Sequence, residues 1–324
     1  MTDLPLKDAL RSSSAVEAIV VPFKRYRFAF SVTEPVGLPD YAGSQIRGSF
    51  GRALRRICCM TRQKDCKSCP LYRTCAYTQV FETPPPPTHP LQHFSQIPNA
   101  YVIEPEGWGR RVCEPGETLE FDLVLIGRAR DSLALVIYAF QKAFSFDIGR
   151  GKAELIRVQT VDGQTTNTIF DSSLKTVREH EQGTRIAVPD GSEIHLQIQT
   201  PLRLQQNGVP LLPGEVTAYP ILTALLRRIA LLYEFQCLDK LDLNFHQLSE
   251  MAGAVALESS LEWVDWIRYS SRQNRHMNLG GVTGSIVLRD VPPEFRVLLA
   301  AGQLSHVGKN ATFGLGRYRI EIGR

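Results

Sequence analysis

The chain has 324 residues, of which 43% are hydrophobic and 22% are charged, and its formal net charge at neutral pH is +4. This length suits two domains of ordinary size, each with its own core. No stretch approaches about 18 uninterrupted apolar residues, and the opening MTDLPLKDALRSSS lacks a secretory pattern. We therefore predict a cytoplasmic protein with no membrane partner, whose mild positive charge permits an anionic partner without requiring one.

The first regular elements are a strand and a basic helix. Residues 18–33 are rich in β-branched and aromatic residues with partial alternation, which predicts a strand. In GSQIRGSFGRALRRIC, residues 43–58, the apolar side chains fall on one face of a helix. The opposite face carries four basic side chains, Arg47, Arg52, Arg55 and Arg56.

A cysteine cluster follows this helix. Five of the seven cysteines lie in CCMTRQKDCKSCPLYRTC, as Cys58 and Cys59, then Cys66, Cys69 and Cys75. One of the first two thiols with the other three would close tetrahedrally on one Zn(II), so we expect a structural zinc site in an insertion at about residues 58–98. An iron–sulfur cluster is one alternative, because the spacing does not separate the two metals, and a cluster without metal is the other.

The order of elements occurs twice along the chain. After the insertion come strands at 100–103 and 119–126, a helix at 132–144, the turn FDIGRG and another strand. The second copy has a strand at 193–204, a helix at 215–235, strands at 261–271 and 280–288, a helix at 292–302 and a last strand at 313–322, with an extra helical piece at 244–256.

Each copy has the order βαββαβ. We therefore predict an α+β protein of tandem ferredoxin-like (RRM-like) βαββαβ domains with a Cys-rich metal-binding insertion in the first. The domains are expected at residues 1–185 and 186–324, joined within the polar stretch 164–191.

Glycine-rich turns precede the last strand of each copy. The second turn contains Gly308, Gly314 and Gly316 with Lys309 and Arg317, and the first is bordered by Arg150 and Lys152. Glycines allow backbone amides to approach a phosphate, and the cations would add charge. The alternative is a turn that needs positive φ and no more.

A second basic segment, RYSSRQNRH, spans residues 268–276 and contains no acidic residue. It supplies phosphate donors, amide groups and one stacking ring, through Arg268, Tyr269, Arg272, Gln273, Arg275 and His276. Single-stranded RNA or the base of an RNA hairpin suits such an edge, and a solvated hairpin tip is the alternative.

Together these segments resemble a known family. The terminal GQLSHVGKNATFGLGRYRI, RYSSRQ followed by LGG, and GSQIRGSFGRALRR leading into the cysteines resemble the CRISPR-associated protein six family of the RAMP superfamily. The resemblance implies an endoribonuclease that cleaves precursor CRISPR RNA within its repeat, with repeat RNA and other Cas subunits as partners. It implies attack by a ribose 2′-hydroxyl, 2′,3′-cyclic phosphate and 5′-hydroxyl ends, and no catalytic metal.

The catalytic residues are harder to place. Many members of the family carry a catalytic histidine on or near the first helix, whereas no histidine precedes His89 here. His306 lies three residues before Lys309, an arrangement that would put an imidazole and an ammonium beside one phosphate, and His276 is the next candidate. Tyr269 and Tyr41 are outside candidates, and the remaining histidines are expected at the surface or in packing: His89, His93, His180, His195 and His246.

Two other functions are open. The missing early histidine favours a catalytically silent RAMP subunit that holds RNA in an effector complex. A metal-dependent enzyme at the cysteine cluster is disfavoured, because no acidic constellation or H-x-E pattern accompanies the thiols.

Overall fold

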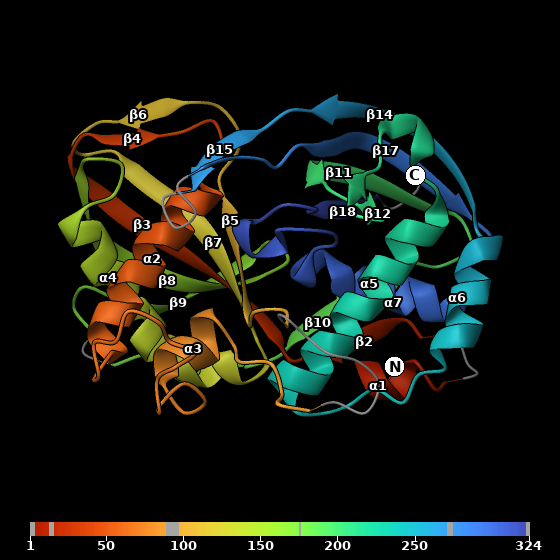
Figure 1. Cartoon of the computed structure of the whole chain (residues 1–324), viewed down its shortest axis with the longest axis horizontal. Helices are drawn as coiled ribbons and strands as arrows, with labels where there is room; N and C mark the ends of the chain where they lie inside the picture. The colour runs from red at the N-terminus through yellow and green to blue at the C-terminus, as the bar shows by residue number, and fades with distance from the viewer. Residues whose placement is uncertain (1–3, 13–15, 89–96, 175, 271–274, 322–324) are drawn as a thin grey trace. The chain divides into compact units, whose positions relative to one another are not determined.

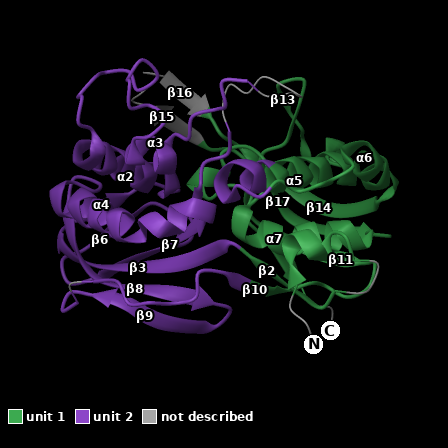
Figure 2. Ribbon diagram, turned by 90° about the horizontal axis from the view of Figure 1, so that it is seen from below, with its two compact units in different colours: residues 1–21, 185–230, 240–324 green, residues 22–184, 231–239 purple. Residues whose placement is uncertain are grey.

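A computed structural model of the chain describes residues 4–12, 16–88, 97–174, 176–270 and 275–321. The chain forms two compact units, coloured green and purple in Figure 2. Unit 1 contains residues 1–21, 185–230 and 240–324, and unit 2 contains residues 22–184 and 231–239. The expected domains differ from these units at two places, because residues 1–21 belong with the C-terminal part and residues 231–239 with the N-terminal part.

Unit 2 is built on a five-stranded antiparallel sheet. Its order is β5 (Tyr101–Pro105), β7 (Thr118–Ile126), β3 (Phe23–Glu34), β8 (Lys152–Asp162) and β9 (Thr165–Asp171). The first four strands lie in the order second, third, first and fourth along the chain, which is the ferredoxin-like order. A short antiparallel pair of β4 (Val36–Leu38) and β6 (Arg111–Cys113) accompanies the sheet (Figure 1).

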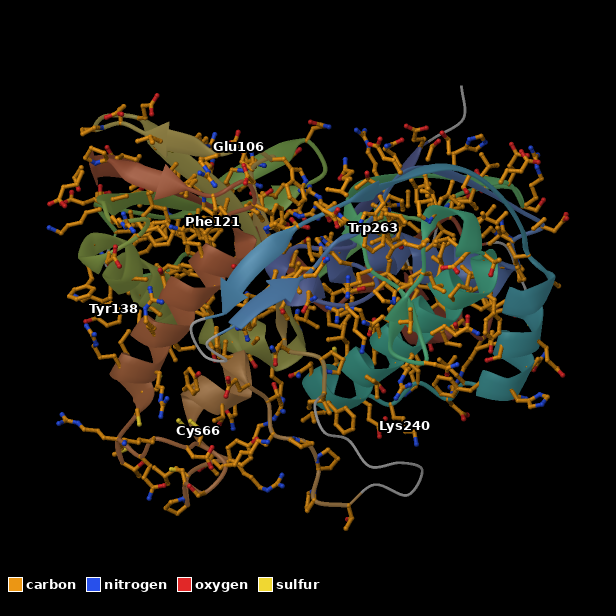
Figure 3. All side chains as sticks on the ribbon, turned by 45° about the horizontal axis from the view of Figure 1, so that its top comes forward. Cys66, Glu106, Phe121, Tyr138, Lys240 and Trp263 are labelled. Atoms are coloured by element: carbon orange, nitrogen blue, oxygen red, sulfur yellow. The ribbon has the colours of Figure 1, made fainter. Side chains whose placement is uncertain are left out.

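One face of this sheet is covered by α2 (Gly43–Cys58) and α4 (Leu133–Phe146). Aromatic rings fill the space between: Phe50 of α2 stacks on Phe140 of α4 at 4.3 Å, and Phe140 in turn contacts Phe28 of β3 and Phe121 of β7. Figure 3 labels Phe121 within this layer. Buried rings of this size dominate the energy of a core, so these contacts fix α2 on the sheet.

The opposite face of the sheet carries ion pairs instead. Side chains alternate between the two faces along β3, so Arg25 points away from the helices. Its guanidinium donates two hydrogen bonds to the carboxylate of Glu104 on β5, at 2.7 and 2.8 Å. Arg27 binds Asp122 in the same bidentate way, at 2.8 and 3.1 Å. The cations of this face are therefore used within the fold.

Unit 1 repeats the ferredoxin-like order in four antiparallel strands: β14 (Ala256–Val264), β17 (Gly281–Arg289), β11 (Ile194–Leu202) and β18 (Tyr318–Glu321). Its helices are α5 (Ala218–Leu232), α6 (Phe245–Ala254) and α7 (Pro293–Ser305), and a π-helical turn follows α5 at Tyr233–Cys237. Tyr318 of β18 donates to the carbonyl of Leu299 in α7 at 2.6 Å, which joins this helix to the sheet edge.

Smaller elements complete the chain. A three-stranded sheet contains β1 (Leu4–Pro5), β2 (Ala18–Val21) and β10 (Thr184–Ala187), next to the short α1 (Leu6–Ala9). Two hairpins consist of β12 (Gln205–Gln206) with β13 (Val209–Pro210), and of β15 (Ile267–Ser270) with β16 (Arg275–Asn278). Within the described residues, no helix is both long and apolar enough to cross a bilayer.

Candidate nucleic-acid interface

The glycine-rich loop, residues 306–317, connects α7 to β18 in unit 1 and is hydrogen-bonded to the end of β11. The amide of Gly316 donates to the carbonyl of Pro201, and the amide of Lys309 donates to the carbonyl of Arg203, both at 3.0 Å. Across the loop, the amide of Val307 donates to the carbonyl of Gly316 at 3.1 Å. These amides are therefore committed to the fold and do not face a ligand.

Two of its glycines are required by close backbone contacts. Gly316 has φ +67°, and a Cβ there would lie 1.7 Å from the carbonyl oxygen of Val307. Gly308 has φ +84°, and its Cβ would lie 2.8 Å from the oxygen of Arg203. Positive φ and these approaches explain the glycines without a ligand. Contact of the loop with phosphate stays a prediction.

His306 is fully buried at the start of this loop. Its ring Nδ1 donates to the carbonyl of Leu315 at 3.2 Å, and its backbone has φ +59° and ψ 176°, a region occupied almost only by glycine. Arg228 of α5 donates from Nε to the carbonyl of the preceding Ser305 at 2.7 Å, and burial lowers the pKa of Arg228 to about 10. This placement does not support direct catalysis by His306, because the ring has no exposed surface.

Other side chains of the loop region do reach solvent. Lys309 is exposed, Arg317 is partly exposed, and Arg319 of β18 is exposed. Arg317 also donates its backbone amide to the hydroxyl of Thr200 at 2.9 Å, which fixes the end of the loop. Lys309 is the side chain of this loop best placed to meet an anion.

The equivalent turn in unit 2 is held in a similar way. Arg150 is exposed with φ +67°, and its amide donates to Asp147 at 3.1 Å. Lys152 forms an ion pair with Glu34 at 2.6 Å. A Cβ at Gly151 would lie 2.0 Å from the oxygen of Pro35. Arg150 therefore remains a candidate phosphate contact, whereas the charge of Lys152 is balanced by a neighbour.

The basic face of α2 divides into structural and exposed arginines. The guanidinium of Arg47 lies 4.2 Å from the ring centroid of Phe81. Burial raises the pKa of Tyr101 to about 12, although the nearby charge of Arg47 acts to lower it. Arg55 donates to the carbonyls of Gln63 and Lys64 at 2.5 and 2.8 Å. Arg47 and Arg55 thus have partners within the fold, and contact of Arg47, Arg52 and Arg55 with RNA stays a prediction.

Arg52 and Arg56 are the exposed arginines of this face. Arg52 is held by the hydroxyl of Ser49 at 3.0 Å, and Arg56 lies 4.9 Å from the ring centroid of Phe146. Tyr41, just before α2, is buried and packs on Trp108 with ring centroids 4.5 Å apart. Helical periodicity predicted that all four arginines lie on one face. It could not predict which of them the neighbouring segments would enclose.

The basic segment 268–276 lies on a hairpin. In the register of β15 and β16, Arg268 pairs with Met277, and Tyr269 pairs with His276. Arg275 of β16 pairs with Ser270. Arg272 and Gln273 lie outside the described residues. The hairpin brings the predicted RNA-binding positions of its two strands opposite each other.

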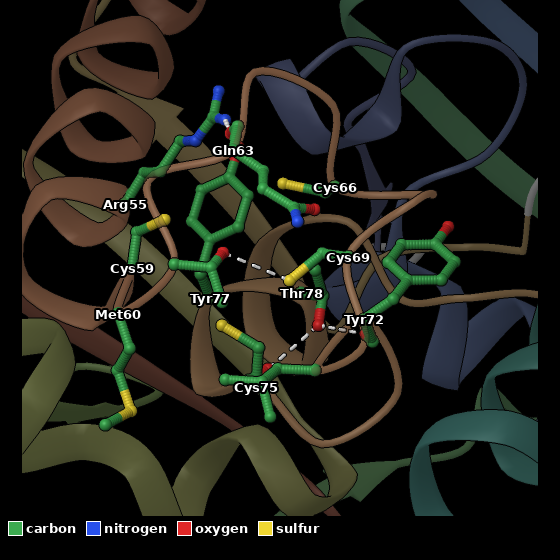
Figure 4. A pocket seen from close by; sticks show the side chains of 12 residues that line it. Arg55, Cys59, Met60, Gln63, Cys66, Cys69, Tyr72, Cys75, Tyr77 and Thr78 are labelled. Atoms are coloured by element: carbon green, nitrogen blue, oxygen red, sulfur yellow. Dashed lines mark hydrogen bonds between the residues drawn. The ribbon is translucent and has the colours of Figure 1, made fainter.

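Four of the five clustered cysteines line one pocket in unit 2, Cys59, Cys66, Cys69 and Cys75 (Figure 4). Cys58, the last residue of α2, does not line it, and Cys58, Cys66 and Cys75 all pack against the hydrophobic core. Burial raises the pKa of both Cys58 and Cys66. Among the described residues, no three cysteine, histidine or acidic side chains are assembled as ligands of a metal ion.

Three further histidines, His180, His195 and His246, are in protein contacts. His180 contacts the hydroxyl of Tyr26 at 3.1 Å, and its Nδ1 donates to the carbonyl of Arg178. His195 contacts Glu193 at 2.9 Å. His246 contacts Glu250, one turn further along α6, at 3.5 Å. His89 and His93 lie outside the described residues.

Comparison with protein-family models gives two matches. The model described as "CRISPR-associated endoribonuclease Cas6" matches residues 196–318, which include the glycine-rich loop and the β15–β16 hairpin. The model AF_1859_N, described as an N-terminal domain, matches residues 21–182. An uncharacterized protein of Archaeoglobus fulgidus is 24% identical over 297 residues, which cover 87% of this chain and 92% of the relative.

Solved structures with the same fold include two that contain Cas6. One is a Cas6 product complex, 15% identical, covering 92% of this chain and 99% of that chain with a TM-score of 0.56. Another is a partial Cas6-RT-Cas1–Cas2 complex, 12% identical, covering 93% of this chain and 46% of that chain with a TM-score of 0.55. At these identities the likeness establishes a shared fold.

Proposed function

We propose that this chain binds CRISPR repeat RNA and cleaves precursor CRISPR RNA within the repeat, because residues 196–318 match the model described as a CRISPR-associated endoribonuclease, Cas6. The observation that carries the proposal is the match of the Cas6 model across residues 196–318, which contain both basic segments of unit 1. Structures with the same fold include a Cas6 product complex and a partial Cas6-RT-Cas1–Cas2 complex, and by analogy with the second we propose other Cas subunits as partners.

The proposed reaction is an internal transesterification. The ribose 2′-hydroxyl loses its proton to a base and attacks the neighbouring phosphorus, and the bond to the 5′-oxygen breaks as that oxygen gains a proton. The products are a 2′,3′-cyclic phosphate and a 5′-hydroxyl. Cations beside the non-bridging oxygens stabilise the charge that builds up on the phosphate.

The chain's exposed cations fit the last of these roles. We assign Lys309 to the phosphate, because it is exposed on a loop whose backbone is fixed by hydrogen bonds. Arg150 and Arg317 are further phosphate contacts in this proposal. His276 remains the candidate acid or base, and no step passes through His306 in its buried position.

Replacement of Lys309 tests the phosphate contact. We expect Lys309→Ala to weaken repeat RNA binding about fivefold, or about 1 kcal/mol, and to reduce the slope of log affinity against log salt by about 0.7. Fluorescence anisotropy titrations at several salt concentrations measure both quantities. Lys240→Ala, which removes another exposed lysine of unit 1 from outside the loop, is the control. An unchanged salt slope in Lys309→Ala would remove this contact from the proposal.

Replacement of His306 separates catalysis from loop positioning. Asparagine places a donor close to the position of the imidazole Nδ1, which bonds Leu315. We expect His306→Asn to lower the free energy of unfolding by about 1–2 kcal/mol, with the single-turnover cleavage rate within about threefold of the parent. A folded variant that binds RNA but has lost cleavage would restore His306 as a catalytic residue.

A second candidate function is a silent RAMP subunit that holds repeat-derived RNA. It is favoured by the burial of His306 and by the protein contacts of His180, His195 and His246. Incubation with a labelled repeat RNA in excess EDTA, followed by analysis of product ends, distinguishes the two. A cyclic phosphate end supports the nuclease, whereas tight binding with intact RNA supports the silent subunit.

A further inference from the structure

The segment from Cys59 to Cys75, between α2 and α3 (Ala76–Phe81), has no helix or strand and no buried side chain. Most of its residues are exposed, and the partly buried ones are the four cysteines together with Leu71 and Tyr72. The interior of this segment therefore consists mainly of thiols. Two neighbouring apolar side chains cannot supply the burial that ordinarily holds a segment of this length.

The four thiols lie around one pocket, and local hydrogen bonds fix the backbone that carries them. The amide of Cys69 donates to the carbonyl of Cys66 at 3.1 Å, so the central pair occupies one tight turn. Cys75 immediately precedes α3, and Cys59 immediately follows α2, so the outer pair sits on the ends of two helices. All four side chains line the same pocket (Figure 4), and Figure 3 shows sulfur atoms gathered near Cys66.

Neighbouring side chains support this arrangement. The hydroxyl of Thr61 contacts the sulfur of Cys69 at 3.2 Å, and Arg55 holds the carbonyls of Gln63 and Lys64. Basic residues lie within the segment or just before it in the sequence: Arg55, Arg56, Arg62, Lys64, Lys67 and Arg73. A centre bound by four thiolates carries net negative charge, which nearby cations offset.

We propose that Cys59, Cys66, Cys69 and Cys75 coordinate a structural metal centre, with Zn(II) as the expected ion. In the part of the chain that the structure describes, the four thiols share a pocket without converging on one point as ligands. A zinc ion would bring the four sulfur atoms to about 2.3 Å from itself, and rotation about the side-chain bonds redirects each sulfur toward the pocket they share. The metal would then replace the missing apolar core of the segment.

The structure also chooses between the two adjacent cysteines. Cys59 lines the pocket together with the other three thiols and Cys58 does not, so Cys59 is the ligand. This choice provides a matched pair of variants one residue apart. Cys59→Ser removes a ligand, whereas Cys58→Ser changes a neighbouring thiol that is not one.

The first experiment measures metals and acid-labile sulfide in the full chain, purified without added metal or chelator. We expect close to one zinc per chain in the parent and in Cys58→Ser, and a loss of at least about 80% of the zinc in Cys59→Ser and Cys66→Ser. Iron with equal sulfide would support the four ligands and identify an iron–sulfur centre in place of zinc. A parent chain without metal, or metal retained by Cys59→Ser and lost by Cys58→Ser, would overturn the proposal.

A second measurement needs no serine variant and so does not depend on their folding. Zinc in the parent chain is exchanged for Co(II), whose visible spectrum reports thiolate ligands and tetrahedral geometry. We expect intense tetrahedral bands with thiolate charge transfer. Weak octahedral bands would contradict a four-thiolate site. Both readouts are independent of RNA cleavage, so failure of this proposal and failure of the proposed function are distinguishable.

Discussion

We expect Gly316→Ala to lower the free energy of unfolding of unit 1 by about 3 kcal/mol or more. Two penalties add at this position. An alanine at φ +67° is strained, and its Cβ would lie 1.7 Å from the oxygen and 2.8 Å from the carbonyl carbon of Val307. Because these atoms belong to the backbone, no side-chain rotation relieves the clash, and the loop must separate from residues 307–308.

Urea unfolding followed by circular dichroism measures this loss, with Gly208→Ala as the control. Gly208 has φ +82°, but nothing lies within 4 Å of a Cβ placed there. The loss of unfolding free energy in Gly208→Ala therefore comes only from the positive φ and should be about 1–2 kcal/mol. Equal losses in the two variants would show that close approach of the backbone at Gly316 does not determine the loop.

The second large effect is expected at the ion pair between Arg25 and Glu104 in unit 2. The Glu104 side chain is 0% exposed and that of Arg25 is 19% exposed, so both charges are largely removed from water. Burial works to lower the pKa of Arg25, but the attraction and hydrogen bonds of Glu104 outweigh it, and the net pKa is raised. Removal of the carboxylate leaves a guanidinium with a greatly reduced counter-charge in a poorly solvated position.

Glu104→Gln is therefore expected to cost about 3–5 kcal/mol of unfolding free energy. Glu34→Gln is the control, because its ion pair with Lys152 is about half exposed on both sides, at 51% and 45%, and should contribute about 0.5 kcal/mol or less. Both are measured by chemical unfolding at neutral pH. A cost at Glu104 no larger than that at Glu34 would refute the importance of the buried pair.

The regular elements of the core could be predicted from hydrophobic periodicity. The helix expected at residues 43–58 is α2 with the same bounds, because its apolar face and basic face follow a period of 3.6 residues. Strand order could be predicted as well, since each βαββαβ run has one well-packed solution. The predicted ferredoxin-like strand order is confirmed in both units.

Edge elements could not be predicted. The stretch expected to be a polar linker contains β9 and β10, because an edge strand needs few apolar side chains when its partner supplies the backbone pairing. The strand expected at residues 261–271 is divided between β14 and the β15–β16 hairpin. Pairing of residues 18–21 with β1 is long-range information that local periodicity does not contain.

The candidate site illustrates the same limit at single residues. Spacing placed His306 next to Lys309, but only the fold shows that the ring turns inward to Leu315 while the lysine stays exposed. Likewise, helical periodicity grouped Arg47 with Arg52, and only tertiary contacts show that Arg47 lies over Phe81. Burial of a polar side chain depends on its neighbours in space, so residue type and spacing identify the segment but not each role.

The most direct test of the proposed function compares two RNAs in excess EDTA. One is a CRISPR repeat from the protein's own locus, and the other carries a single 2′-deoxy residue at the cut site. Cleavage of the first alone, with a cyclic phosphate end, is the result that the proposal predicts. Cleavage of both would contradict attack by the 2′-hydroxyl, and tight binding without cleavage of either would contradict the nuclease and leave the RNA-holding subunit.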